Sequence, residues 1–195
     1  GSHFPYINLF GKFWQRKWPD LLIVWGTNPG ESAPLQSMRK ILDAKESGTQ
    51  IVVIDPRFTV TASKADEYLG IKPGTDSALA LGLMNVILKE NLQDIEFIRE
   101  HTNGPYLVRT DNGKFLRGED IGERKAKAYV LWDKNKAEAK RVRRSNTNNA
   151  ALEGTFEING IKCKPAFQHL YNLAMEYSPQ KVEKITGISA EIIRK

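Results

Sequence analysis

The chain has 195 residues, 41% hydrophobic and 9% aromatic, which suits one ordinary domain with a real core and excludes a disordered chain. Its 29 Lys and Arg exceed its 23 Asp and Glu, but nine of the basic residues lie between residues 124 and 144 and no nucleic-acid-binding motif accompanies them, so no nucleic acid partner is predicted. No membrane helix, internal disulfide or zinc site is predicted, because apolar runs are short, Cys163 is the single cysteine and the three histidines are scattered.

Both ends of the chain are expected to be edges of a piece of a longer protein. Gly1-Ser2-His3 is typical of what remains after a purification tag is removed, and residues 1–19 are interpreted as this remnant plus an N-terminal segment. At the other end, Ser189 begins a helix that stops after about one and a half turns. A helix so short indicates that the sequence is cut inside a longer chain.

Two short apolar runs, Leu21–Trp25 and Ile51–Ile54, predict strands that are buried on both faces. Apolar residues at helical spacing over residues 35–42 predict a helix between them. Strand, helix and strand within about 35 residues form a βαβ unit, so the sheet is predicted to be parallel. A helix over residues 77–90, apolar nearly all round, is expected to be buried in this α/β arrangement.

Beyond residue 104 the pattern changes to short strands and turns. Asn159-Gly160 is a hairpin signal between two such strands, and the basic residues 133–150 are predicted to form an exposed loop. Further strands are expected at 106–109, 115–116 and 129–132, and helices at 92–100, from Pro165 and from Ser178. The predicted fold class is therefore α/β, a parallel-sheet, Rossmann-like three-layer domain over residues 20–195 with small β-hairpin additions.

Candidate binding residues lie in three loops that are expected at the carboxyl edge of the sheet, where parallel sheets bind ligands. We call residues 25–32 the first loop, residues 55–59 the second loop and residues 74–76 the third loop. The candidates are Trp25, Gly26, Thr27, Asn28, Pro29, Gly30, Glu31, Ser32, Asp55, Pro56, Arg57, Phe58, Thr59, Gly74, Thr75 and Asp76.

Each loop has a chemical role that it can fill in nucleotide binding. The glycines of the first loop let backbone approach a phosphate, Asp55 can accept two ribose hydroxyls, and Asp76 can accept the two adjacent donors of guanine. Together they predict a purine dinucleotide along the sheet edge. Two structural alternatives remain, in which Asp76 is the N-cap of its helix and Asp55 closes a turn with Pro56. The first loop matches neither G-x-G-x-x-G nor a Walker A motif.

The segments that contain these loops, Trp25–Ser32, Val53–Asp66 and Ile71–Leu83, resemble the dimethyl sulfoxide reductase family of molybdopterin oxidoreductases. Residues 159–167 and 185–190 resemble a later segment of the same family. The resemblance covers roughly residues 20–195 and depends on the order and spacing of the three loops together.

The resemblance implies a domain that binds one molybdopterin guanine dinucleotide of a pair that holds molybdenum or tungsten. By motif match, Gly26–Ser32 would line the phosphates and the pterin side, Asp55–Thr59 would contact the nucleotide sugar and Gly74–Asp76 would hold the guanine. The family's metal ligand and iron–sulfur region lie outside this chain. No catalytic or metal-ligating residue is therefore expected here, Cys163 is interpreted as a buried or strand-edge thiol, and the chain alone is expected to be inactive.

The resemblance also implies the setting of the parent protein. Its partners would be the other domains of its own chain, an electron-transfer iron–sulfur subunit and a membrane anchor subunit, on the periplasmic or cytoplasmic face of a prokaryotic membrane. Reduction of an S- or N-oxide is the favoured reaction, although the sequence names no substrate. The alternative is a freestanding NAD- or FAD-type nucleotide-binding or regulatory domain without molybdenum chemistry.

Overall fold

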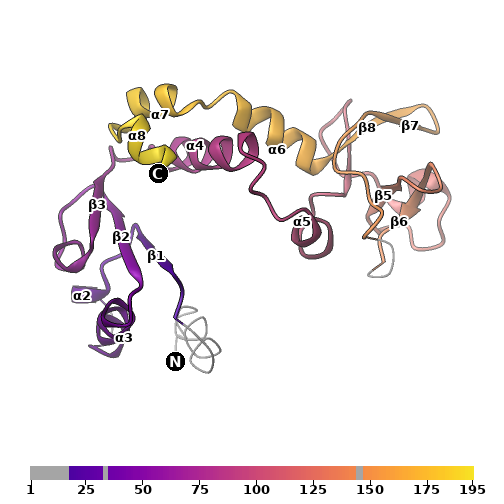
Figure 1. The fold of residues 1–195 in the computed structure, drawn as a ribbon. Helices are drawn as coiled ribbons and strands as arrows, with labels where there is room; N and C mark the ends of the chain where they lie inside the picture. Colours follow the sequence, from indigo (N-terminus) through magenta and orange to yellow (C-terminus); the bar gives the residue numbers. More distant parts are fainter. Residues whose placement is uncertain (1–17, 33–34, 144–146) are drawn as a thin grey trace. The chain divides into compact units, whose positions relative to one another are not determined.

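The computed structural model describes residues 18–32, 35–143 and 147–195 (Figure 1). Most of the predicted N-terminal segment thus lies outside the described residues. The described residues fall into two compact units. The first unit contains residues 18–32, 35–79, 180–193 and 195, and the second contains residues 80–143, 147–179 and 194.

The first unit is built on a parallel sheet of three strands, β1 (Leu21–Trp25), β2 (Gln50–Asp55) and β3 (Glu67–Gly70), side by side in that order (Figure 1). Helix α3 (Leu35–Glu46) connects β1 to β2, which forms the predicted βαβ unit. The α/β fold class with a parallel sheet is confirmed.

One face of this sheet carries the core of the unit. Val24 and Val53 are buried there and pack with Ile41 of α3. On the other face of β1, Leu21 and Ile23 are 49% and 43% exposed, so the prediction of burial on both faces is wrong for this strand. The physical reason is that side chains of a strand alternate between faces, and α3 covers only one of them.

Strand β3 has no counterpart in the predicted elements, because its four residues include no continuous apolar run. The residue before it, Asp66, joins the strand to the sheet: its carboxylate accepts the N–H of Ile51 at 2.7 Å and pairs with Lys45 Nζ at 2.8 Å. The lysine ammonium, followed by the backbone N–H, lowers the pKa of Asp66.

The remaining elements of the first unit are short, apart from the start of a long helix. They are α2 (Pro29–Ser32), the 3₁₀ turn η1 (Ala62–Lys64), the beginning of α4 (Asp76–Lys89), and most of α7 (Pro179–Thr186) and α8 (Ala190–Arg194). The predicted N-cap of α8 is confirmed, because the Ser189 side chain accepts the N–H of Ile192 at 3.3 Å.

The second unit combines helices with two small antiparallel sheets. Its helices are the rest of α4, α5 (Ile95–His101) and α6 (Ala166–Met175), and Phe167 and Ala174 of α6 pack with Leu88 of α4. The three-stranded sheet has the order β4 (Leu107–Arg109), β8 (Ile161–Pro165), β7 (Phe156–Ile158). The two-stranded sheet pairs β5 (Val130–Asp133) with β6 (Glu138–Arg141). A 3₁₀ turn, η2, spans Gly118–Ile121.

The predicted hairpin at Asn159-Gly160 is confirmed. Strands β7 and β8 pair in antiparallel fashion, and both turn residues have positive φ, 51° and 77°. Such values are those of a two-residue turn whose twist matches the strands. The predicted strand at 115–116 is reduced to one bridge between Val108 and Phe115.

The prediction of an exposed basic loop over residues 133–150 is wrong for much of its length, because β6 lies inside it and pairs with β5. Asp133 is 5% exposed, and its carboxylate accepts hydrogen bonds from Lys140 Nζ at 2.7 Å and from the N–H of Asn135 at 3.0 Å. The bond from Lys140 has the largest effect, and together these contacts lower the pKa of Asp133. One buried carboxylate thus offsets part of the repulsion among the basic residues, and Ala150 is also buried.

Cys163 of β8 is buried, as the sequence predicts, and burial raises the pKa of its thiol to about 11. Because the thiolate is the reactive form, we expect iodoacetamide at pH 8 to modify Cys163 at least about a hundredfold more slowly in the folded chain than in guanidinium chloride. Mass spectrometry of timed samples measures both rates. Equal rates would contradict a buried thiol.

Candidate functional site

The three loops predicted to bind a nucleotide meet at one edge of the parallel sheet. The first loop begins at the end of β1, the second begins at the end of β2, and the third lies just beyond β3 and enters α4. Since the three strands are parallel neighbours, their carboxyl ends share one edge. All of the candidate residues belong to the first unit.

Asn28 organises the first loop. Its carbonyl accepts the N–H of Glu31 at 3.1 Å, and both the N–H and the hydroxyl of Ser32 at 2.9 and 2.8 Å. These bonds close the single turn of α2, which begins at Pro29, a residue favoured at a first helical position. The Asn28 side chain donates Nδ2–H to Glu31 Oε2 at 2.6 Å. Thr27 is exposed beside this turn.

Two glycines of the first loop are required for different reasons. Gly26 has φ of +62°, a conformation that L side chains rarely adopt, and the space that a Cβ would enter is open. At Gly30 a Cβ would lie only 3.1 Å from Thr61 Oγ1 and 3.1 Å from Val60 Cγ1. The backbone at Gly30 therefore approaches the segment after the second loop closely.

The second loop is a tight turn. Asp55 Oδ1 accepts the N–H of Arg57 at 2.8 Å, so the structural alternative of a turn closed by Asp55 around Pro56 is present. The Asp55 carbonyl accepts the Tyr68 hydroxyl at 2.9 Å, which ties the turn to β3. The Asp55 carboxylate remains partly exposed, so a turn role and a ligand role are compatible.

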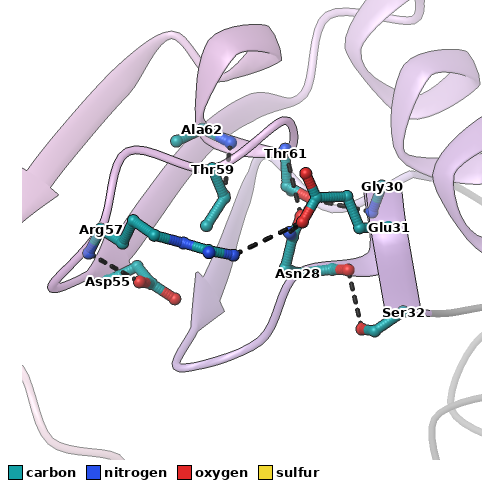
Figure 2. A network of polar contacts seen from close by, with 9 residues as sticks. All are labelled: Asn28, Gly30, Glu31, Ser32, Asp55, Arg57, Thr59, Thr61 and Ala62. Atoms are coloured by element: carbon teal, nitrogen blue, oxygen red, sulfur yellow. Dashed lines mark hydrogen bonds and ion pairs between the residues drawn. The ribbon is translucent and has the colours of Figure 1, made fainter.

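The last two residues of the second loop point to different environments. Phe58 is 63% exposed and lies edge-on to Tyr68, with ring centroids 5.0 Å apart. Thr59 is buried, and its hydroxyl accepts the N–H of Ala62 at 3.1 Å (Figure 2). The hydroxyl of Thr59 therefore stabilises the turn at η1.

The first and second loops are joined by side chains (Figure 2). Thr61 Oγ1 donates to Asn28 Oδ1 at 2.7 Å and accepts the N–H of Gly30 at 2.9 Å. The guanidinium of Arg57 reaches Glu31 Oε2 at 3.4 Å. Thr61 is absent from the predicted candidates, because it follows the second loop and nothing in its own neighbourhood indicates partners some 30 residues earlier.

The third loop is joined to the first loop by Trp25, whose indole N–H donates to Asp76 Oδ1 at 2.7 Å. Asp76 is the first residue of α4, and the carbonyl of Thr75 accepts the N–H of Ala78 at 3.0 Å, so Thr75 holds the N-cap position. The alternative of Asp76 as the N-cap is therefore wrong.

Backbone contacts hold the third loop on its other side. The Thr75 hydroxyl donates to the Lys72 carbonyl at 2.7 Å, and the Lys72 N–H donates to the Thr186 carbonyl of α7 at 3.0 Å. Between them Gly74 has φ of +77°, again with open space where a Cβ would lie. The loop is thus fixed by hydrogen bonds while its glycine leaves the surface accessible.

The edge built in this way presents charged side chains and open backbone positions. It offers carboxylates at Glu31, Asp55 and Asp76, the cation of Arg57 and two open glycine positions. Among the residues that the structure describes, no group of three or more His, Cys, Asp or Glu has an arrangement for a metal ion. None of the described helices has the length and apolar character to cross a membrane.

Comparison with known proteins gives one family. The family model described as "Molybdopterin oxidoreductase" matches residues 17–193. Perchlorate reductase subunit alpha of Dechloromonas aromatica (strain RCB) is 34% identical over 209 residues, which cover 88% of this chain and 22% of that protein. Dimethylsulfide dehydrogenase subunit alpha of Rhodovulum sulfidophilum is 30% identical over 207 residues, 100% of this chain and 23% of that protein.

A shorter match has higher identity. F420-dependent formate dehydrogenase 1 subunit alpha of Methanococcus maripaludis is 48% identical over 91 residues, which cover 47% of this chain and 13% of that protein. The chain spans only about a fifth of the length of the relatives that match most of it, 22% and 23% for the two described above.

Proposed function

Because the chain belongs to the molybdopterin oxidoreductase family, we propose that its three loops bind the guanine nucleotide part of a molybdopterin guanine dinucleotide. The observation that carries the proposal is the pair of links by which Trp25 and Thr61 join the three loops at one sheet edge. A ligand laid along that edge would meet residues of all three loops. Binding at this edge is the general behaviour of open parallel sheets.

The residues present fit such a ligand. Gly26 and Gly74 leave open the positions that a Cβ would fill, so a phosphate or a base can approach the backbone of the first and third loops. Arg57, with its side chain 74% exposed, supplies a cation for a diphosphate. Asp55, at the end of β2, occupies the place from which an acidic residue accepts ribose hydroxyls.

In this proposal Asp76 reads the base. Trp25 takes one side of the carboxylate, and an ionised carboxylate has further acceptor capacity on both oxygens. Guanine offers N1–H and its amino group as adjacent donors, whereas adenine offers an amino group beside an acceptor nitrogen. A carboxylate therefore matches guanine and leaves the ring nitrogen of adenine facing an acceptor.

The chain would act as part of a longer oxidoreductase. When bound, the pterin cofactor supplies redox chemistry at molybdenum or tungsten, and the residues of this chain bind and orient its nucleotide end. The parent would reduce an S- or N-oxide or a similar electron acceptor, with an iron–sulfur cluster in another region. Other domains of that chain, an iron–sulfur subunit and a membrane anchor subunit would be its partners.

Calorimetric titration of the 195-residue chain with GDP and with ADP tests the proposal. GDP is expected to bind more tightly by about tenfold, the effect of one mismatched hydrogen bond. Failure of GDP to bind would contradict the proposed function. Equal affinity, or a preference for ADP, would instead favour a general adenine or dinucleotide site of the NAD or FAD type.

A further inference from the structure

Thr61 packs against the first loop, and its hydroxyl group both donates and accepts a hydrogen bond there. It is 1% exposed, donates to Asn28 Oδ1 at 2.7 Å and accepts the N–H of Gly30 at 2.9 Å. A hydroxyl has only one hydrogen to donate, so its donor is committed to Asn28. Because so little of Thr61 is exposed, a ligand on the outside of the first loop cannot reach its hydroxyl.

These contacts determine which way the Asn28 amide points. Two donors, the hydroxyl and the backbone N–H of Thr61, face the same Asn28 atom at 2.7 and 3.4 Å, so that atom is the amide oxygen. The Asn28 NH₂ group is then directed to Glu31, at 2.6 Å. A reversed amide would place its NH₂ group against the N–H of Thr61 and its oxygen against the carboxylate of Glu31, so donor would face donor and acceptor would face acceptor.

The same hydroxyl holds the backbone of the first loop at close range. The space for a Cβ at Gly30 is filled by Thr61 Oγ1 and Val60 Cγ1, each 3.1 Å away. Since Thr61 is only 1% exposed, water has little room to replace its hydroxyl if it is removed, and the N–H of Gly30 would lose its partner.

We propose that Thr61 is a positioning residue, which holds Asn28 and the Gly30 backbone in the conformation that receives the phosphates of the nucleotide. This inference rests on the proposed function, and it adds a residue outside the three loops to the site. Thr61 acts through the first loop and makes no contact with the ligand. Thr61 also couples the first loop to the second. It holds the first loop, and it lies in the segment that directly follows the second loop.

The test compares Thr61→Val, which keeps the shape of the side chain and removes the hydroxyl, with Thr61→Ser, which keeps the hydroxyl. Amide hydrogen exchange at Gly30, measured by NMR without nucleotide, should accelerate by about tenfold or more in Thr61→Val and stay near the unmodified value in Thr61→Ser. GDP affinity, measured by calorimetry, should fall by about tenfold in Thr61→Val and be retained in Thr61→Ser.

Thr49→Val is the matched control. Thr49 is also buried, 3% exposed, and its hydroxyl donates to the Pro19 carbonyl at 2.6 Å, at the opposite end of β2 from the loops. This variant should alter neither Gly30 exchange nor GDP affinity. A similar loss in Thr49→Val would show that general destabilisation is the cause and would overturn the positioning role.

The outcomes separate the two proposals. If the unmodified chain binds no GDP, the proposed function is contradicted, and with it the role of Thr61 in nucleotide binding, whatever the exchange at Gly30. If the unmodified chain binds GDP and Thr61→Val binds it equally well, only the positioning role is overturned. Loss of binding in Thr61→Ser as well would also overturn it, because the hydroxyl would then not be the group that matters.

Discussion

Replacement of Asp76 by asparagine is expected to abolish the preference of the chain for guanine over adenine nucleotides. Trp25 donates its indole N–H to the side chain of residue 76, so an asparagine would turn its amide oxygen toward Trp25. Its NH₂ group would then face the base, opposite a donor of guanine. One such mismatch costs about 1–3 kcal/mol, which is about a tenfold or greater loss of GDP affinity, measured by calorimetry.

Asp94→Asn provides the control for the lost charge. Asp94 also stands at the start of a helix, where it caps α5 by accepting the N–H of Phe97 at 2.9 Å, and asparagine caps equally well. We expect this variant to retain its ratio of GDP to ADP affinity. An unchanged ratio in Asp76→Asn would show that Asp76 only anchors Trp25 and does not read the base.

Gly30→Val is expected to disrupt the first loop through overcrowding. The added side chain would start 3.1 Å from Thr61 Oγ1 and Val60 Cγ1, and overpacking of this kind costs about 1–3 kcal/mol. In a chain of this size each kcal/mol lowers the Tm by about 2–4 °C, which differential scanning calorimetry measures. GDP affinity should fall by more than about tenfold, because Gly30 and Asn28 would move from Thr61.

A second substitution tests whether crowding is the cause. Gly30→Ala should produce a smaller loss of stability than Gly30→Val, and adding Val60→Ala should recover part of it by removing one of the crowding atoms. Val60 is 45% exposed, so Val60→Ala alone should have little effect. Strict additivity of the two alanine substitutions would contradict the crowding explanation.

The sequence predicts those parts of the molecule whose pattern is local. The apolar run of β2, the helix α4 and the Asn159-Gly160 turn each carry their signal within a few residues. The predicted α/β class follows from the βαβ order of β1, α3 and β2, and it is confirmed. The meeting of the three loops at one edge follows in turn from parallel pairing.

The features that the sequence does not predict depend on distant partners. Thr61 contacts the first loop only because Asn28 and Gly30 fold against it. The run of basic residues around Lys140 predicts a solvated loop, because the sequence does not show that Lys140 pairs with the buried carboxylate of Asp133. Likewise, the carboxylate of Asp76 is held by Trp25, which lies 51 residues earlier in the chain and donates its indole N–H to it.

The separation of Trp25 and Asp76 along the chain affects how the three loops assemble during folding. The Trp25–Asp76 bond closes a loop of 51 residues that includes α3, β2 and β3, so it cannot form early from local structure. A chain in which any of these elements is unfolded cannot bring the three loops together. Nucleotide binding would therefore select fully folded chains and, by mass action, protect the whole parallel sheet against unfolding and proteolysis.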